Sequence, residues 1–471
     1  MNTSTITSSE TSPAKRRFRK LRFVLIALAV FALTVAIFYG EENWRGKRAW
    51  ENCKRELEAQ GAILDWNKLI PPPVPDDQNF FKAPKMAEWF VKHSQSMTNE
   101  LTEQLRNPDT TATDLNETVA AKYLAWSDQF EPDFDLLRKA LKRPYARMDA
   151  NYSLPSEWPV PNFVAVRAVS QVLAQRAKCH LLLAQQEQAL RDLTLMHDMR
   201  HLLECAPTGK PMTLVAAMIN VQVTGFYTDV IADGFRKQAW QEPQLVALQS
   251  QLADMNLTPF VVDGFRMEQS AISGYRLSDV MLYDKTNFWQ KLESKAFWLF
   301  DVAPRGWTYQ NMAVAAHLYQ KLCNSVDLSN DIMSPKEIDT AIRETEHTRN
   351  NSSPFVLLGR MIIPNFSRAT QVTSHNQAMI NEAQIACALE RYKLANGNYP
   401  ETLDALAPQF IEKIPHDIIG GQPLHYRRTS DGKFLLYSVG WNETDDGGQI
   451  STATNKWGQP DFTQSDWVWK N

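Results

Sequence analysis

The strongest pattern in the chain lies near its start, where residues 15–41 read KRRFRKLRFVLIALAVFALTVAIFYGE. A basic cluster here precedes an uninterrupted apolar run from Phe23 to Tyr39. A helix rises about 1.5 Å per residue, so this run covers roughly 25 Å, and Gly40 and the flanks extend it toward the ~30 Å hydrocarbon core of a bilayer. The pattern predicts a transmembrane helix over residues 23–40, through which the protein contacts the lipid bilayer.

The basic cluster also predicts the orientation of this helix. Lysine and arginine are retained on the cytoplasmic side, so residues 1–22 are expected to be a cytoplasmic tail and the chain beyond Glu41 to be translocated. A cleaved signal peptide is the competing interpretation. Against it, the apolar run is longer than a usual signal-peptide core, and the stretch from Tyr39 to Glu42 lacks a cleavage site of small residues. A buried core helix fits less well, because basic residues directly adjoin the apolar run.

The overall composition is that of a water-soluble globular protein attached to this segment. The chain has 471 residues, 44% hydrophobic and 22% charged, which suggests two or three folded units. Its formal net charge of −3 gives no general electrostatic reason to expect nucleic-acid binding. The five cysteines are scattered without a CxxC pair, so we expect buried apolar residues, with one or two disulfides as the alternative.

Changes of pattern along the chain predict its organisation after the membrane. Residues 41–97 are expected to form a helical stalk that ends at Gly61, followed by a proline-rich spacer and an aromatic docking group. A helical domain is expected over residues 98–324, and a polar linker over residues 325–354. The last unit, residues 355–471, is expected to begin with a long helix over Ser367–Ala395 and to contain two strands. The fold class is therefore mainly α, with a small α+β unit at the end.

Apolar periodicity is strongest from Asn162 to Leu203. Small and apolar residues recur every three or four positions and are interrupted at Gln185-Gln186, which predicts two antiparallel helices. The pair has the size of one tetratricopeptide repeat, with Ala177 and Ala189 near the turn. Because no second copy follows at a 34-residue period, we expect a helical bundle that is only weakly tetratricopeptide-like.

The end of the chain carries an ordered succession of short motifs. They are ALERYKLANGNYP at residues 388–400, DGKFLLYSVG at residues 431–440 and DDGG at residues 445–448. This succession resembles the globular end of the major pseudopilins of type II secretion. As a whole, the chain is similar to uncharacterised single-pass bacterial envelope proteins. The resemblance implies a pseudopilin-like fold over about the last hundred residues, a bacterial inner-membrane location and a periplasmic body.

The chain also departs from the pseudopilin pattern. Arg22 stands where a pseudopilin has the glycine before its cleavage point, and Ala27 stands in place of the glutamate at the fifth mature position. The predicted long helix is also far from the membrane segment in sequence. These departures argue against a filament subunit and favour a pseudopilin-like module reused in the periplasm.

In the pseudopilin family, the loop after the last strands binds calcium. The resemblance carries this site to Asp445 and Asp446, with Asn442 and the Val439 carbonyl as further oxygen donors. Carboxylate and carbonyl oxygens suit a hard cation, and Gly447 and Gly448 permit a tight bend. The alternative is a plain turn without metal, since Asp-Asp-Gly-Gly is also ordinary turn chemistry.

Other polar groups carry weaker signals. His197 and His201 lie one helical turn apart, but Asp198 replaces the glutamate of the zinc motif and no third ligand is evident. Ion pairs are expected between Asp263 and Arg266 and between Arg276 and Asp279. The tryptophans near the end are expected to cover the small core rather than to bind a sugar or peptide; they are Trp441, Trp457, Trp467 and Trp469.

Two classes of function compete at this point. No phosphate loop, nucleophile elbow or Cys/His arrangement indicates an enzyme. The favoured hypothesis is a membrane-anchored scaffold that presents its body to an envelope protein partner, with the last unit as a docking or secretion-related module. The alternative is an envelope hydrolase or ligand-binding protein with a site in the helical domain, for which a cleft lined by His197, His201, Glu204 or Glu268 would be the evidence.

Overall fold

The computed structural model describes most of the chain. The described residues are 13–91, 99–106, 115–153, 155, 158–204, 207, 209–210, 213–274, 303–349, 353–451, 453–454 and 461–470. The fold is mainly helical, as expected, and begins with a long apolar helix. Three predictions lie outside these residues: the Arg276/Asp279 pair, Trp457 and the burial of Cys205.

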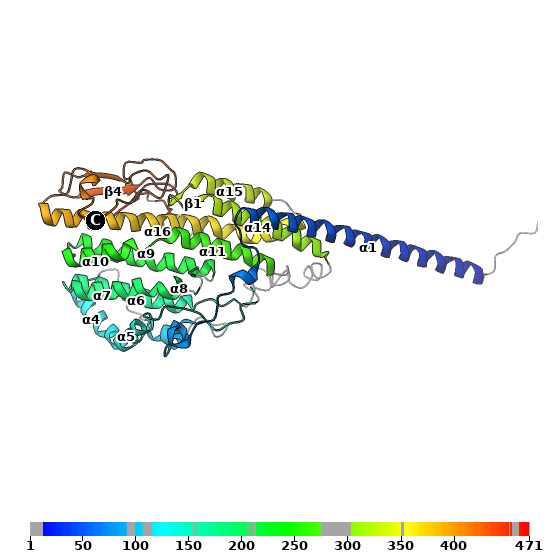
Figure 1. Cartoon of the computed structure of the whole chain (residues 1–471), viewed down its shortest axis with the longest axis horizontal. Coiled ribbons are helices and arrows are strands. Elements are labelled where there is room, and N and C mark those ends of the chain that lie inside the picture. Colours follow the sequence, from blue (N-terminus) through cyan, green and yellow to red (C-terminus); the bar gives the residue numbers. More distant parts are fainter. Residues whose placement is uncertain are drawn as a thin grey trace, which may run out of the picture.

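Helix α1 (Pro13–Ala59) is a single long rod (Figure 1). Its N-terminal part projects from the body, and its C-terminal part, the inner end, lies along the body. The expected stalk is therefore the same helix as the exposed apolar segment. The helix ends at Ala59, and Gly61 follows it with a φ of +89°. Unlike a free stalk, its inner end is packed, because Trp50, Cys53 and Leu57 are buried against helix α14 (Arg305–Asn324).

The segment after α1 forms short helical turns that wrap the body. The turns are η1 (Trp66–Leu69), η2 (Asp76–Gln78), η3 (Phe80–Lys82), α2 (Met86–Phe90) and α3 (Glu100–Gln104). The proline-rich stretch is extended where it ends, with φ −60° and ψ 141° at Pro75. The aromatic residues that follow, Phe80, Phe81, Trp89 and Phe90, are buried in the apolar core of the body.

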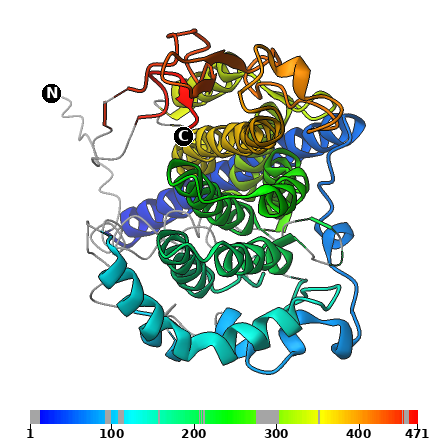
Figure 2. The ribbon, with the colours of Figure 1, turned by 90° about the vertical axis from the view of Figure 1, so that its left-hand side faces the viewer.

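The helical body is built in layers (Figure 2). The outermost layer holds α4 (Glu117–Ser127), η5 (Asp128–Phe130) and α5 (Glu131–Ala140), and the next holds α6 (Phe163–Leu182), α7 (Gln186–Met199) and α8 (His201–Glu204). A third layer holds α9 (Leu214–Arg236), α10 (Glu242–Ala253), α11 (Leu257–Ala271) and η7 (Ile272–Gly274). Asparagine or threonine side chains cap several of these helices, including Asn162 on α6 and Thr213 on α9.

The central element of the body is helix α16 (Leu357–Asn396). It packs on α9, α10, α11 and α14, and it ends at Gly397 in the left-handed region, as the Asn-Gly-Asn sequence predicts. The helix begins ten residues earlier than predicted and continues through Pro364. Its outer side carries η10 (Leu403–Leu406) and an antiparallel sheet ordered β3 (His425–Arg428), β4 (Phe434–Ser438) and β5 (Trp467–Val468).

The sheet register places Tyr437 opposite His425 on β3 and opposite Val468 on β5. Strands β3 and β4 confirm the sequence prediction, whereas β5 was not predicted because it contains only two residues. Trp441, Trp467 and Trp469 are buried, which confirms the expected core role for these three tryptophans.

The expected linker at residues 325–354 has to be corrected. These residues contain the hairpin of β1 (Val326–Asp327) and β2 (Ile332–Met333), helix α15 (Pro335–Arg349) and η9 (Pro354–Val356). Met333 and Ile338 are almost fully buried, and α15 packs on α16. The charged residues around these few apolar positions conceal the helical period in the sequence.

The packing of the described residues also fails to separate a helical domain from a C-terminal unit. One continuous cluster of buried apolar residues extends from Trp50 to Trp469. The body is therefore a single packed structure in which α16 lies between the helical layers and the small sheet.

Candidate functional site

The junction between α1 and α14 lies directly after the apolar segment. Glu42 is buried, and its Oε2 accepts a hydrogen bond of 3.0 Å from Trp307 Nε1. Asn43 Oδ1 accepts one of 2.9 Å from the Gly306 backbone amide, at the start of α14. These bonds attach α14 two or three residues beyond Gly40. The sequence does not predict this pairing, because its partners are more than 260 residues apart.

Two glycines let the helices touch at this junction. A Cβ atom added at Gly46 would lie 2.1 Å from the Gly306 carbonyl oxygen, and one added at Gly306 would lie 1.9 Å from the Glu42 carbonyl oxygen. Only residues without side chains fit such an approach. Further along α1, the Cys53 thiol lies 3.7 Å from the Ala313 carbonyl oxygen, and burial raises its pKa to about 12. We therefore expect this thiol to react slowly while α1 is docked.

The four cysteines that the structure describes share this environment. Cys53, Cys179, Cys323 and Cys387 are all buried and unpaired with one another. The expectation of buried apolar cysteines is thus confirmed for these four residues.

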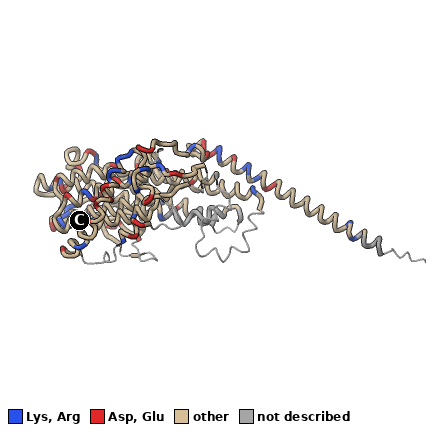
Figure 3. Tube along the Cα trace, turned by 90° about the horizontal axis from the view of Figure 1, so that it is seen from below, with Lys and Arg blue, Asp and Glu red and all other residues tan. Residues whose placement is uncertain are grey.

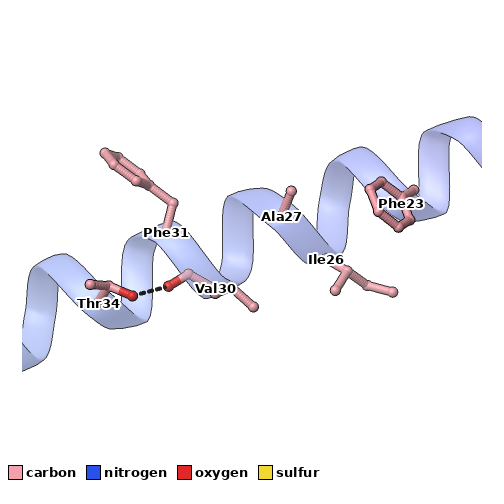
Figure 4. A pocket seen from close by; sticks show the side chains of 6 residues that line it. All are labelled: Phe23, Ile26, Ala27, Val30, Phe31 and Thr34. Carbon is pink, nitrogen blue, oxygen red and sulfur yellow. Dashed lines mark hydrogen bonds between the residues drawn. The ribbon is translucent and has the colours of Figure 1, made fainter.

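The outer part of α1 is long and apolar enough to cross a membrane. Its most apolar stretch of 18 residues has a mean hydropathy of 2.6, and none of that stretch is buried. Figure 3 shows that charged residues follow this stretch only where α1 nears the body. Figure 4 shows a shallow hollow on this helix, where Thr34 Oγ1 donates a 2.9 Å hydrogen bond to the Val30 carbonyl. That bond satisfies the hydroxyl without water, as a hydrocarbon environment requires. Helix α9 is also apolar, but 61% of its window is buried in the body.

The predicted calcium loop lies at the surface beside β4. Asp445 Oδ1 accepts hydrogen bonds of 2.9 Å from both the Tyr437 hydroxyl and the Gly447 amide. These bonds lower the pKa of Asp445. Asp446 Oδ2 accepts one of 2.9 Å from Asn442 Nδ2. The structure therefore brings Asn442, Asp445 and Asp446 into one loop.

Asp466 is a further carboxylate of this loop that the sequence analysis did not identify. It accepts hydrogen bonds of 3.2 Å from the Asp446 amide and 2.7 Å from the Gly448 amide. Burial raises the pKa of Asp466, and the negative charges of Asp446 and Asp445 raise it further. The oxygen donors suit calcium in kind, although hydrogen bonds within the loop occupy several of them. Among the described residues, no three acidic, histidine or cysteine side chains form a metal-binding group.

Two buried carboxyl groups, Asp417 and Glu382, lie near the end of β4. Asp417 accepts three hydrogen bonds of 2.7–3.0 Å, from the Ser438 hydroxyl and from the amides of Ile419 and Val439. Glu382, on α16, is fully buried, and neither of its oxygens makes a hydrogen bond of standard geometry within the described part of the chain. Burial raises the pKa of Glu382 well above its ordinary value, and the nearby Asp417 raises it further.

The raised pKa of Glu382 predicts a pH-dependent effect on stability. In the unfolded chain this carboxyl ionises above a pH of about 4.3, whereas the folded protein retains its proton to a higher pH. Its contribution to stability is therefore complete below about pH 4 and is lost as the pH rises, by at most about 1.4 kcal/mol per pH unit. We expect the unfolding free energy of Glu382→Gln, measured with urea, to increase relative to that of the wild type as the pH rises from 5 to 8.

The control for this experiment is Glu412→Gln, because Glu412 is exposed. Its unfolding free energy should follow the wild type at each pH. A difference between Glu382→Gln and wild type that stays constant with pH would contradict the assignment of a buried protonated acid.

The residues named for a catalytic alternative have separate partners. His197 Nδ1 lies 3.1 Å from Asp198 Oδ1, and His201 Nε2 lies 2.5 Å from the Arg143 carbonyl oxygen. Glu204 accepts hydrogen bonds from Arg200 and from Asn220, and Glu268 accepts one from the Leu214 amide at the start of α9. These contacts fix helix ends and neighbouring helices. The Asp263–Arg266 ion pair, at 3.0 Å, is formed as predicted.

A buried ionic cluster around Arg176 was missed by the sequence analysis. This side chain is 6% exposed and contacts Asp128, Glu131 and Asp192 at 2.8–3.3 Å. Arg176 thereby joins α6 to α7, η5 and α5. Burial raises the pKa of Asp192 to about 7, and Arg176 acts in the opposite direction. The position of Arg176 could have predicted this cluster, because an arginine on the apolar stripe of a helix is buried and therefore needs an acidic partner.

Comparisons of the chain with protein-family models, with curated proteins and with solved structures find no match.

Proposed function

We propose that this protein is a single-pass scaffold or interaction protein of the bacterial cell envelope, anchored in the inner membrane. The observation that carries the proposal is the continuity of α1, which joins the exposed apolar segment to the docked residues Trp50, Cys53 and Leu57. A body attached in this way has a fixed height and orientation above the membrane. Such an arrangement suits a protein that presents a surface to a partner.

The proposed topology places residues 1–22 in the cytoplasm and the body in the periplasm. The basic residues before Phe23 support this orientation. The small sheet on α16 is, in this proposal, the pseudopilin-like docking module. The α6–α7 pair remains compatible with a weakly tetratricopeptide-like hairpin, since it is one antiparallel pair in a layered bundle.

We expect a reporter that is active only outside the cytoplasm to be active when fused after Gly61, and the full-length chain to stay in membranes after an alkaline carbonate wash. A matched fusion after Arg22 should be inactive, because it precedes the membrane segment. Release into the soluble fraction, with a mature N-terminus beyond Tyr39, would identify a cleaved signal peptide and overturn the proposal. Crosslinking in native membranes followed by purification of the full-length protein would identify the partner.

Calcium binding at Asp445 and Asp446 is a separate proposal, which rests on the resemblance of this loop. An ion would relieve the repulsion between Asp445 and Asp446 and would stabilise the folded state by about 2.7 kcal/mol at a hundredfold excess over Kd. We expect the melting temperature of the full-length protein to rise in calcium relative to chelator. The double variant Asp445→Asn with Asp446→Asn should lose this difference. Equal melting temperatures of the wild type in calcium and chelator would leave the loop as a plain turn.

A further inference from the structure

Just beyond its apolar segment, α1 exposes a large aromatic side chain, Trp44, on the face that does not pack on α14. Trp44 is 62% exposed, whereas Trp50, on the same helix, is 8% exposed and buried against the body. Of the described large hydrophobic residues beyond Gly40, Trp44 is the most exposed. Packing within the body therefore does not account for this tryptophan.

The position of Trp44 along α1 matches the headgroup region of a bilayer. It lies four residues beyond Gly40, which places it about 6 Å past the apolar segment. The headgroup layer adds about 5–8 Å on each side of the hydrocarbon core. Tryptophan is enriched in this layer, because its ring is apolar while its indole N–H forms hydrogen bonds with headgroups and water.

Basic side chains neighbour Trp44 along α1. The Arg48 guanidinium carbon lies 5.4 Å from the Trp44 ring centroid, and the Lys47 side chain is 65% exposed, with its Nζ 3.8 Å from the Glu51 carboxylate. Arg305, the first residue of α14, is also exposed and adjoins the Gly306–Asn43 contact. A tryptophan flanked by exposed cations fits a surface of anionic headgroups.

We propose that Trp44, with Lys47, Arg48 and Arg305, binds the headgroup layer of an anionic phospholipid bilayer and so fixes the depth of α1 and the height of the body. This inference rests on the proposed membrane anchoring and adds a specific lipid contact. Because α1 is rigidly joined to α14 through Glu42, Asn43 and the two glycines, the depth of Trp44 determines where the body stands.

The test uses the full-length protein reconstituted into phosphatidylcholine vesicles that contain phosphatidylglycerol and phospholipids brominated at defined depths. The emission of Trp44 is obtained by subtracting the spectrum of Trp44→Phe from that of the wild type. We expect bromines near the headgroup to remove most of this emission, bromines near the chain end to remove little, and aqueous iodide to remove little. The matched control is Trp50→Phe, whose difference spectrum should be unaffected by every quencher.

Two outcomes would overturn the lipid contact. Quenching of Trp44 by iodide but not by brominated lipid would place it in water, and insensitivity to both would place it under protein, such as a second copy of the chain. A protein that does not float with the vesicles would instead contradict the membrane anchoring itself, so the two failures are distinguishable.

A separate double variant tests whether the basic residues near Trp44 prefer anionic lipids. With Lys47→Gln and Arg48→Gln combined, quenching by brominated lipid should persist but should no longer increase with the phosphatidylglycerol content. If the double variant keeps the wild-type dependence on phosphatidylglycerol, these two cations do not recognise the headgroups.

Discussion

Gly46→Leu is expected to separate the inner end of α1 from the body. A side chain at this position would collide with the Gly306 backbone, because its Cβ alone would lie 2.1 Å from the carbonyl oxygen. Overpacking costs typically about 1–3 kcal/mol even where side chains can adjust, and here the obstacle is backbone. Relief requires the helices to move apart, which would expose Trp50, Cys53 and Leu57.

The Cys53 thiol reports this separation. Its pKa of about 12 in the docked state would return toward the ordinary value of about 8.5, so its thiolate fraction at neutral pH would rise on the order of a thousandfold. We expect maleimide to label Cys53 rapidly in Gly46→Leu and slowly in the wild type, as followed by peptide mass spectrometry. The matched control is Gly40→Leu, since Gly40 has no atom within 4 Å of an added Cβ. Slow labelling of Cys53 in Gly46→Leu would show that the junction tolerates a side chain.

Arg176→Ala is expected to destabilise the protein by about 3–5 kcal/mol, because it leaves Asp192 buried without its cation. The side chain of Asp192 is only 3% exposed. The loss should be smaller at pH 5 than at pH 8, because Asp192 has a pKa of about 7 even beside Arg176 and is therefore protonated and uncharged at pH 5. Urea unfolding at the two pH values measures both effects.

The matched control for this variant is Arg167→Ala, which removes an exposed arginine from the same helix. It should change the free energy of unfolding by no more than about 0.5 kcal/mol. A loss below about 1 kcal/mol in Arg176→Ala, equal at both pH values, would mean that the cluster does not stabilise the layers it joins.

The helices with strong apolar periodicity could be predicted from the sequence, and the partners of those helices could not. Val166, Leu173 and Leu181 recur at helical spacing on α6 and indicate one buried face. Gly397 likewise marks the end of α16. Helix α15 escaped prediction because Ile338 and Ala341 are scattered among charged residues. Helix α16 is buried on several sides, so no single apolar stripe in its sequence marks the buried positions. The burial of Glu382 could therefore not be predicted from the sequence.

The same limit applies to the candidate sites. The apolar segment of α1 and the loop of Asp445 and Asp446 are each formed by residues that are adjacent in the sequence, so local patterns predicted them. Asp466 reaches this loop because β5 pairs with β4, and Asp417 and Glu382 come together at the end of β4 only because the sheet packs on α16. The Gly46–Gly306 contact likewise requires two helices that are far apart in the chain to pack side by side.

The central claim is that α1 joins the membrane to the body without a hinge. Hydrogen exchange of the full-length protein in lipid nanodiscs tests it most directly, because an intact helix protects its backbone amides. We predict continuous protection from the apolar segment through Leu57, including residues 40–46, and faster exchange beginning at Gly61. Rapid exchange at residues 40–46, with the rest of the body still protected, would reveal a flexible joint and contradict the claim.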